Sequence, residues 1–145
     1  MLLGMDTIRA QEAIQNIHAK ASECQRNGDY EGAEKTYRDS LLLYPNNPGM
    51  LLGLAGVLAL KGDAEEAIEL IEHGLPLSSS EKQNATMRAT LCFLYLKAGR
   101  ADKANQLASG LPHMRESREV ILPLIQQGLD ENQVDQEIKR ILLGE

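Results

Sequence analysis

The chain has 145 residues, 43% of them hydrophobic and 25% charged, which is ordinary for a single globular domain. Aromatic residues make up 3% and tryptophan is absent, so the core must consist of leucine, isoleucine and alanine, a composition that favours helices over a β-sandwich or barrel. The formal net charge is −6 and there is no basic tract, which argues against nucleic acid or an anionic lipid surface as a partner.

The N-terminal stretch MLLGMDTIRA has too short an apolar run for a signal peptide and no basic region before it. The longest apolar run, residues 50–60, has 11 residues, whereas a membrane span needs about 20. These features predict no membrane insertion. With only two cysteines and no export signal, the sequence predicts a cytoplasmic protein with reduced thiols.

Three glycines divide the chain at intervals of 34 and 37 residues: Gly28, Gly62 and Gly99. Apolar or small residues recur at helical spacing on both sides of each glycine. The residues before them are Ile17, Ala21 and Cys24; Leu51, Leu54, Ala55 and Leu58; Leu91, Cys92 and Tyr95. Those after them are Ala33, Tyr37, Ser40 and Leu41; Ala67, Ile71 and Gly74; Ala104, Ala108 and Leu111. Each interval therefore predicts a helix hairpin with the glycine at its bend.

Local signals support these bends. A glycine that ends a helix commonly adopts the left-handed conformation. Asp29 and Asp63 follow the first two glycines as N-cap residues, and Glu66 stands at the capping-box distance from Asp63. Three additional residues precede the third hairpin, where either Ser78 with Glu81 or Ser80 with Gln83 can cap the helix. We expect these residues to lengthen the front of that helix.

The repeated pattern resembles the tetratricopeptide repeat, a helix-turn-helix unit of 34 residues. The resemblance covers three tandem units at about residues 14–47, 48–81 and 85–117. Lys20 and Arg88 depart from it, as do Ser79 and Glu116, which stand where the terminal proline is expected. The resemblance implies an all-α, right-handed superhelix of antiparallel helix hairpins in one domain spanning residues 1–145.

The C-terminal part shows a weaker version of the same pattern. Val134, Ile138 and Ile141 repeat the helical spacing, and Pro123 either kinks its helix or begins it. We interpret residues 118–143 as a degenerate hairpin that caps the stack, formed by one bent helix or by two.

The sequence contains no pattern for catalysis or for a cofactor. His18, His73 and His113 fall in different repeats without ligand spacing, so surface histidines are expected rather than a metal site. Cys24 and Cys92 take inward positions two repeats apart, too distant for a disulfide. The expectation is a protein that is not an enzyme and binds neither metal nor cofactor.

In the resembling family the first helix of each hairpin lines a concave groove. Transferring those positions predicts a partner-binding groove at His18, Ser22, Leu52, Gly53, Gly56, Leu60, Ala89, Thr90, Phe93 and Leu96. The positions that form the family's carboxylate clamp hold no matching residues here, so no clamp is expected. Gly53 and Gly56 share one helix face, which indicates a close approach there, either by a neighbouring helix or by an apolar or helical ligand.

These features together predict a non-enzymatic module that binds a peptide or amphipathic helix of another protein in an apolar groove. The alternative is a self-assembling scaffold, a homo-oligomer formed through apolar terminal faces or through exchange of the C-terminal helix. In either case the stretch 134–143 can fold into the groove of its own chain or of a neighbour.

Overall fold

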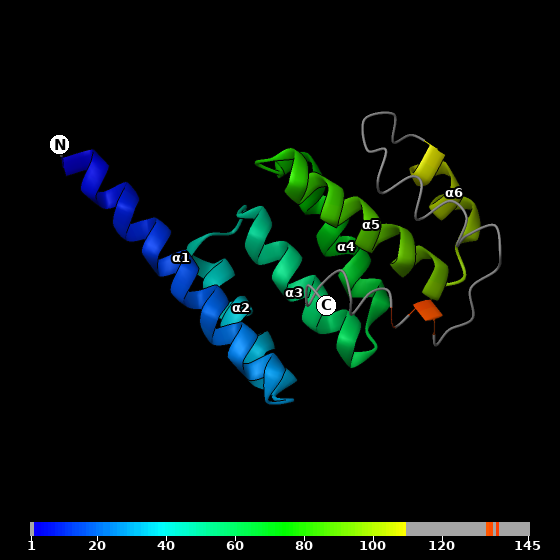
Figure 1. The fold of residues 1–145 in the computed structure, drawn as a ribbon, viewed down its shortest axis with the longest axis horizontal. Coiled ribbons are helices and arrows are strands. Elements are labelled where there is room, and N and C mark those ends of the chain that lie inside the picture. The colour runs from blue at the N-terminus through cyan, green and yellow to red at the C-terminus, as the bar shows by residue number, and fades with distance from the viewer. Residues whose placement is uncertain (1, 110–132, 135, 137–145) are drawn as a thin grey trace.

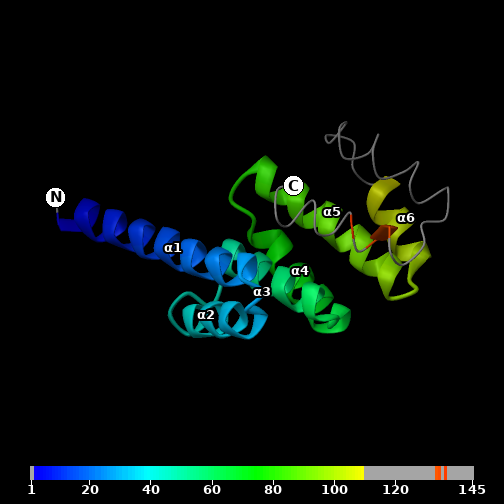
Figure 2. The ribbon, with the colours of Figure 1, turned by 60° about the horizontal axis from the view of Figure 1, so that its bottom comes forward.

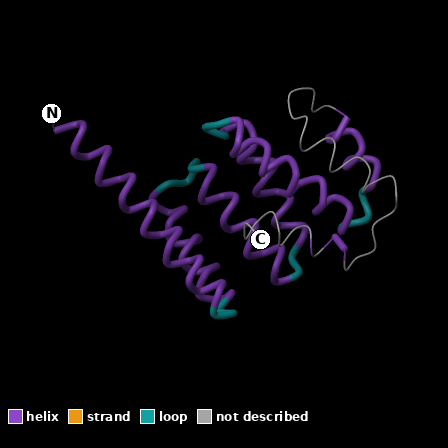
Figure 3. The backbone as a smooth tube through the Cα atoms, in the orientation of Figure 1, coloured by secondary structure: helices purple, strands orange, loops and turns teal. Residues whose placement is uncertain are grey.

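The computed structural model describes residues 2–109 together with 133, 134 and 136 (Figure 1). The part described up to residue 109 consists of helices joined by short turns and contains no strand (Figure 3). The helices are α1 (Leu2–Arg26), α2 (Tyr30–Leu43), α3 (Pro48–Lys61), α4 (Ala64–Gly74), the short 3-10 helix η1 (Leu75–Leu77), α5 (Glu81–Lys97) and α6 (Ala101–Ser109). The all-α prediction is therefore confirmed.

The three predicted bends have the same hydrogen-bonded geometry. Gly28, Gly62 and Gly99 all have left-handed φ angles, of 76°, 94° and 77°. At the first bend, Asp29 N donates to Cys24 O at 2.7 Å and Gly28 N donates to Gln25 O at 3.0 Å. The same pair of bonds recurs at the equivalent positions of the other two bends, which is the Schellman pattern of helix termination. The repeat is thus a repeat of local geometry.

Side chains cap the helices that follow the turns. Asp29 accepts from Gly32 N at 2.9 Å, and Asp63 accepts from Glu66 N at 3.3 Å. Of the two alternatives for α5, the structure selects Ser80, which accepts from Gln83 N at 3.0 Å. The reciprocal half of the predicted capping box is absent at Asp63, because the Glu66 carboxylate binds Arg38 instead and Asp63 N donates to Leu58 O.

The hairpins stack one on another. The helix pairs α1 and α2, α3 and α4, and α5 and α6 each pack together, and α2 against α3 and α4 against α5 join successive hairpins. Figures 1 and 2 show the first helices α1, α3 and α5 following one another along the stack. As expected, the additional residues lengthen α5, which has 17 residues against 14 in α3. In contrast, α1 begins at Leu2, well before residue 14, and its first half extends beyond α2 (Figure 2).

Small residues at the recurring positions bring these helices close together. Ala21, Ala33, Ala55, Ala67 and Ala104 are each fully buried in one continuous core. The larger side chains of this core include Met50, Leu54, Ile68, Ile71, Met87, Phe93 and Leu94. The predicted capping hairpin lies outside the described residues except for Gln133, Val134 and Gln136. Val134 is 2% exposed and belongs to the same core, so the chain returns to the hairpins at that residue.

Ion pairs join the second helices to their neighbours. Lys61 at the end of α3 binds Glu31 and Glu34 of α2, and Arg38 of α2 binds both Glu34 and Glu66 of α4. One repeat further on, Arg100 binds Glu65 at 2.8 Å. Equivalent contacts between hairpins therefore recur along this side of the stack.

Candidate functional site

A pocket of about 310 Å³ lies where the first helices of the three hairpins meet. Such a volume is at the small end of ligand pockets in proteins. Residues from α1, α3 and α5, with one side chain from α2, line it. They are His18, Ser22, Gln25, Tyr37, Gly49, Leu52, Gly53, Gly56, Gln83 and Thr86. We call this cavity the concave pocket.

His18 is held in this pocket by Tyr37. His18 Nδ1 lies 3.2 Å from the Tyr37 hydroxyl oxygen, and the two rings meet edge to face with centroids 5.6 Å apart. Burial lowers the pKa of His18 and raises the pKa of Tyr37 to about 12. Both side chains are therefore neutral at neutral pH. The expectation of a surface histidine is wrong for His18, since the ring is half-buried against α2.

Tyr37 also accounts for the glycine at position 53. A Cβ atom on Gly53 would lie 2.8 Å from the Tyr37 hydroxyl and closer still to carbons of the ring. The aromatic ring of α2 thus occupies the space that a side chain on α3 would need. Of the two explanations open for Gly53, the structure supports the neighbouring helix of the same stack rather than a ligand.

The amide of Gln83 forms the opposite edge of the pocket. Its Oε1 atom accepts from the backbone N–H of Ser79 at 2.8 Å and from the Ser79 hydroxyl at 3.0 Å. These two bonds fix which end of the amide is the carbonyl. The NH₂ group lies on the side of Gly49, where an added Cβ atom would be 3.7 Å from Gln83 Nε2 and 3.2 Å from both His18 Nε2 and Asn47 Oδ1.

The chemistry of the pocket is polar but uncharged. Its lining residues include serine, threonine, two glutamines and a neutral histidine, and none of them is Lys, Arg, Asp or Glu. Leu52 and the Tyr37 ring supply apolar surface beside these groups. The arrangement can donate and accept hydrogen bonds and cover a small apolar group, but offers no fixed charge to an ionised ligand.

The structure brings five of the ten predicted groove residues into the concave pocket: His18, Ser22, Leu52, Gly53 and Gly56. Three others are interior residues: Ala89 is 8% exposed, and Thr90 and Phe93 are 0% exposed. The prediction that these three residues lie on an open partner surface is wrong. All seven residues from 89 to 95 are buried, so α5 is enclosed on every side there. Leu60 and Leu96 are half-buried and do not line the pocket.

Five lining residues are not among the ten predicted groove residues: Gln25, Tyr37, Gly49, Gln83 and Thr86. Tyr37 was assigned to the packing of the second helix, and it does pack there, yet its hydroxyl reaches the pocket. Gly49 and Gln83 lie in the first turns of α3 and α5. The Ser80 cap was a usable signal for Gln83, because a residue three positions after the cap lies at the mouth of its helix.

The potential metal ligands of the described residues do not cluster. No group of three or more potential ligands comes together in that part of the chain. Both cysteines are free, and burial raises the pKa of Cys92 to about 12, which keeps its thiol protonated and unreactive.

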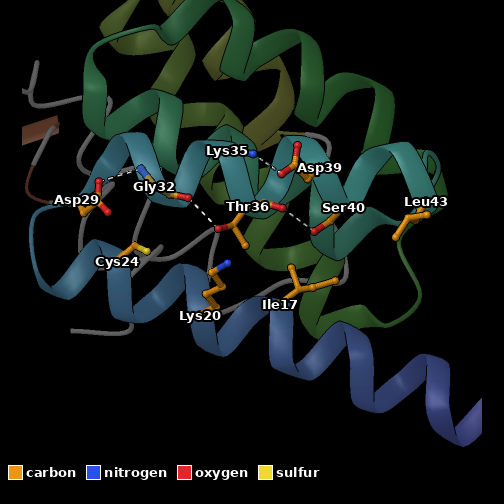
Figure 4. A pocket seen from close by; sticks show the side chains of 10 residues that line it. All are labelled: Ile17, Lys20, Cys24, Asp29, Gly32, Lys35, Thr36, Asp39, Ser40 and Leu43. Atoms are coloured by element: carbon orange, nitrogen blue, oxygen red, sulfur yellow. Dashed lines mark hydrogen bonds and ion pairs between the residues drawn. The ribbon is translucent and has the colours of Figure 1, made fainter.

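A second cavity, of about 440 Å³, lies between α1 and α2 at the outer end of the stack. Figure 4 shows Ile17, Lys20 and Cys24 of α1 directed toward Thr36 and Ser40 of α2, with Leu43 at one end. We call this region the end-face cavity. In the next hairpin, the residues 34 positions after Ile17, Lys20 and Cys24 are Leu51, Leu54 and Leu58, and all three are buried.

The comparison with protein families agrees with this architecture. Residues 25–78, from the first bend to the end of the second hairpin, match the tetratricopeptide repeat. Proteins with these repeats generally bind protein partners and are typically not enzymes. A search of curated proteins finds no match. Among the described residues, no helix has the length and apolar character that crossing a membrane requires.

Proposed function

We propose that the chain is a non-enzymatic module that binds a peptide segment of a partner protein in the concave pocket. The observation that carries the proposal is the meeting of three first helices around one cavity, where half of the predicted groove residues gather. A shallow site built from separate helices can contact a segment lying across all of them. The acidic chain continues to argue against nucleic acid as the partner.

The size and chemistry of the pocket limit what enters it. A cavity of about 310 Å³ accommodates one or two side chains, while the rest of the segment lies along the exposed parts of α1, α3 and α5. Leu52 and Tyr37 favour a small apolar group next to a polar one. An amphipathic segment, helical or extended, meets these requirements.

Peptide display from a random library tests this proposal with a variant that fills the pocket. Gly49→Gln places a side chain in the pocket. Gly49 has no left-handed φ, but the new Cβ would lie 3.2 Å from His18 Nε2 and from Asn47 Oδ1, so these side chains must shift slightly. The matched control is Glu69→Gln, on the exposed face of α4. Selected peptides should bind Gly49→Gln at least about tenfold more weakly than wild type in fluorescence anisotropy, and the control should bind equally.

The proposal fails if the library yields no saturable binder, or if the peptides bind Gly49→Gln and the control equally. Circular dichroism melting of both variants establishes that a lost signal reflects the pocket rather than unfolding.

The second candidate is a self-assembling scaffold, which exposed leucines at the outer end of the stack favour. Leu42 is 82% exposed and Leu43 is 74% exposed, next to the end-face cavity. Adjacent apolar surface at the end of a repeat stack can bind the corresponding surface of another molecule. Sedimentation velocity over a concentration series should then show growth that Leu42→Lys with Leu43→Glu abolishes. Concentration-independent monomer in the wild type contradicts this candidate.

Deletion of residues 130–145 tests the other route to self-association, exchange of the C-terminal helix. Because Val134 is buried in the core, the deletion should raise the binding of an apolar dye or shift the oligomer distribution. A monomeric truncated protein with unchanged dye binding rules out the exchange.

A further inference from the structure

His18 places an imidazole in the lining of the concave pocket, where the ring is only half-buried. It lies there with Leu52 and Tyr37, the apolar surface that the proposed segment covers. A segment that fills the pocket therefore removes water that the free ring still contacts. Removing water from an ionisable group disfavours its charged form. Occupation of the pocket by an uncharged group consequently favours the neutral imidazole.

The described residues that line the pocket include no carboxylate to compensate a charge on this ring. Apart from His18, the lining residues from α1 and α5 are uncharged: Ser22, Gln25, Gln83 and Thr86. The charged residues of α5 do not line the pocket. The one charged residue of α3, Lys61, lies at the far end of that helix and binds carboxylates of α2. From α2 the lining receives Tyr37, whose pKa burial raises to about 12.

The hydrogen bond between His18 and Tyr37 also depends on the charge of the imidazole. His18 Nδ1 lies 3.2 Å from the Tyr37 hydroxyl oxygen, and no other described residue bonds to that hydroxyl. A neutral imidazole can accept the hydroxyl proton, whereas an imidazolium has only N–H donors. Protonation of His18 thus leaves the Tyr37 proton without this acceptor. Because Tyr37 is 4% exposed, water replaces the acceptor poorly, which adds to the cost of the charged state.

We propose that the concave pocket is a pH-dependent site, which holds an uncharged part of the partner segment while His18 is neutral and releases it when His18 is protonated. This inference rests on the proposed function, because it concerns the segment bound there. Binding then releases a proton from any protein molecule whose His18 carries one. Burial already lowers the pKa of His18 below 6.5 in the free protein, so affinity should be constant above that value and fall as the pH is lowered below it.

Peptides without titratable groups of their own test this pH dependence. A random library is restricted to sequences that lack Asp, Glu, His and Cys, with both ends blocked, so that only the protein titrates between about pH 7.5 and pH 5.5. Fluorescence anisotropy measures binding to the full-length protein at both pH values. We expect the dissociation constant to rise at least about twofold at the lower pH. Calorimetry in two buffers of different ionisation enthalpy should show proton release on binding at the lower pH only.

Two histidine variants make the assignment specific. His18→Gln replaces the titrating ring with a neutral side chain, so the variant should bind the peptides equally at the two pH values, whatever its absolute affinity. His73→Gln is the matched control, because His73 is exposed on α4 and does not line the pocket, and it should keep the pH dependence of the wild type. Circular dichroism at each pH shows that the proteins are folded. Proton release by the wild type decides the question even if His18→Gln does not bind.

The inference is overturned if the wild type binds these peptides equally at both pH values without releasing a proton, or if binding strengthens on acidification. It is equally overturned if His18→Gln weakens at the lower pH as much as the wild type does. Peptides whose binding is sensitive to Gly49→Gln but independent of pH would contradict the pH dependence and leave the proposed function intact. A library that yields no binder contradicts the proposed function, and this inference with it.

Discussion

The two sides of the helix stack are held by different kinds of contact. Around the concave pocket, which we call the inner side, Tyr37 fills the space beside Gly53 and forms a hydrogen bond with His18. Phe93 is completely buried. On the side with the ion pairs, which we call the outer side, Arg38 and Lys61 bind carboxylates of neighbouring hairpins. The Arg38 side chain is 43% exposed and the Lys61 side chain 28%. Equivalent helices therefore meet through neutral, enclosed groups on one side and through hydrated charges on the other.

This difference shows where the stability of the stack is expected to come from. Enclosed contacts stabilise the fold because they remove apolar surface from water, and a void or a steric overlap among them lowers stability strongly. Exposed ion pairs gain little, because water and salt compete with each of them. The inner side can hold a binding pocket because strongly stabilising buried contacts fix its shape. Residues on the outer side can be substituted with little effect on the fold.

The largest effect is expected for Phe93→Ala. Phe93 is 0% exposed and sits in the part of α5 that is buried all round, so the substitution leaves a cavity and should lower the free energy of unfolding by about 3–5 kcal/mol. Urea denaturation followed by circular dichroism measures the change. The matched substitution Leu42→Ala, at an 82% exposed leucine, should change stability by less than about 0.5 kcal/mol.

If Phe93→Ala lowers the free energy of unfolding by less than about 1 kcal/mol, Phe93 lies on an open surface, as predicted from the sequence. The contrast between the two sides would then disappear.

A smaller loss, of about 1–3 kcal/mol, is expected for Gly53→Ala. Alanine is the better helix former by about 1 kcal/mol, so a net loss requires the overlap with the Tyr37 ring to outweigh propensity. Combining Gly53→Ala with Tyr37→Leu should recover part of the loss, and a double-mutant cycle by urea denaturation measures that coupling. Stabilisation by Gly53→Ala would show that the two helices have room to separate.

The sequence predicted the bends and the helices around them because their causes are local. The glycine at each bend and the capping carboxylates of Asp29 and Asp63 act within one turn of the chain. Each of these signals repeats at a nearly fixed interval, and the repetition made them recognisable. The length of α1 was missed because its first half precedes the repeat pattern.

The candidate site was only half predicted, because it depends on contacts between hairpins. Residues at groove positions were transferred helix by helix, without knowledge of what encloses α5 at Thr90 and Phe93. Tyr37 packs in the core and also lines the pocket, whereas a pattern of spacing along one helix assigns it only the first of these roles. The distance from His18 to Gly49 and Gln83 is a property of three separate helices, which spacing in the sequence does not encode.

The neutral state of His18 predicts a specific dependence of stability on pH. Burial lowers its pKa in the folded protein below the unfolded value of 6.5, so the unfolded chain binds the proton more readily. No penalty exists above the unfolded pKa, and stability falls as the pH is lowered through the window between the two values. Its titratable neighbour in the pocket is Tyr37, which stays protonated throughout because its pKa is about 12.

His18→Gln isolates this contribution, since all carboxylates remain in both proteins. Between about pH 7 and pH 5 the wild type should lose more unfolding free energy than the variant, as measured by urea denaturation at each pH. Parallel curves for the two proteins would mean that His18 titrates as it does in the unfolded chain.

The smallest effect is expected on the outer side. Arg38→Gln removes bonds of 2.9 Å to Glu34 and 3.0 Å to Glu66, yet it should cost less than about 1 kcal/mol, because the guanidinium is partly hydrated. The loss should shrink further in about 0.5 M salt, which screens exposed charges. Lys35→Gln, which breaks the more exposed pair with Asp39 within α2, should produce no measurable change. A loss for Arg38→Gln as large as that for Gly53→Ala, unaffected by salt, would mean that the outer charges fix the spacing of the hairpins as strongly as the inner packing does.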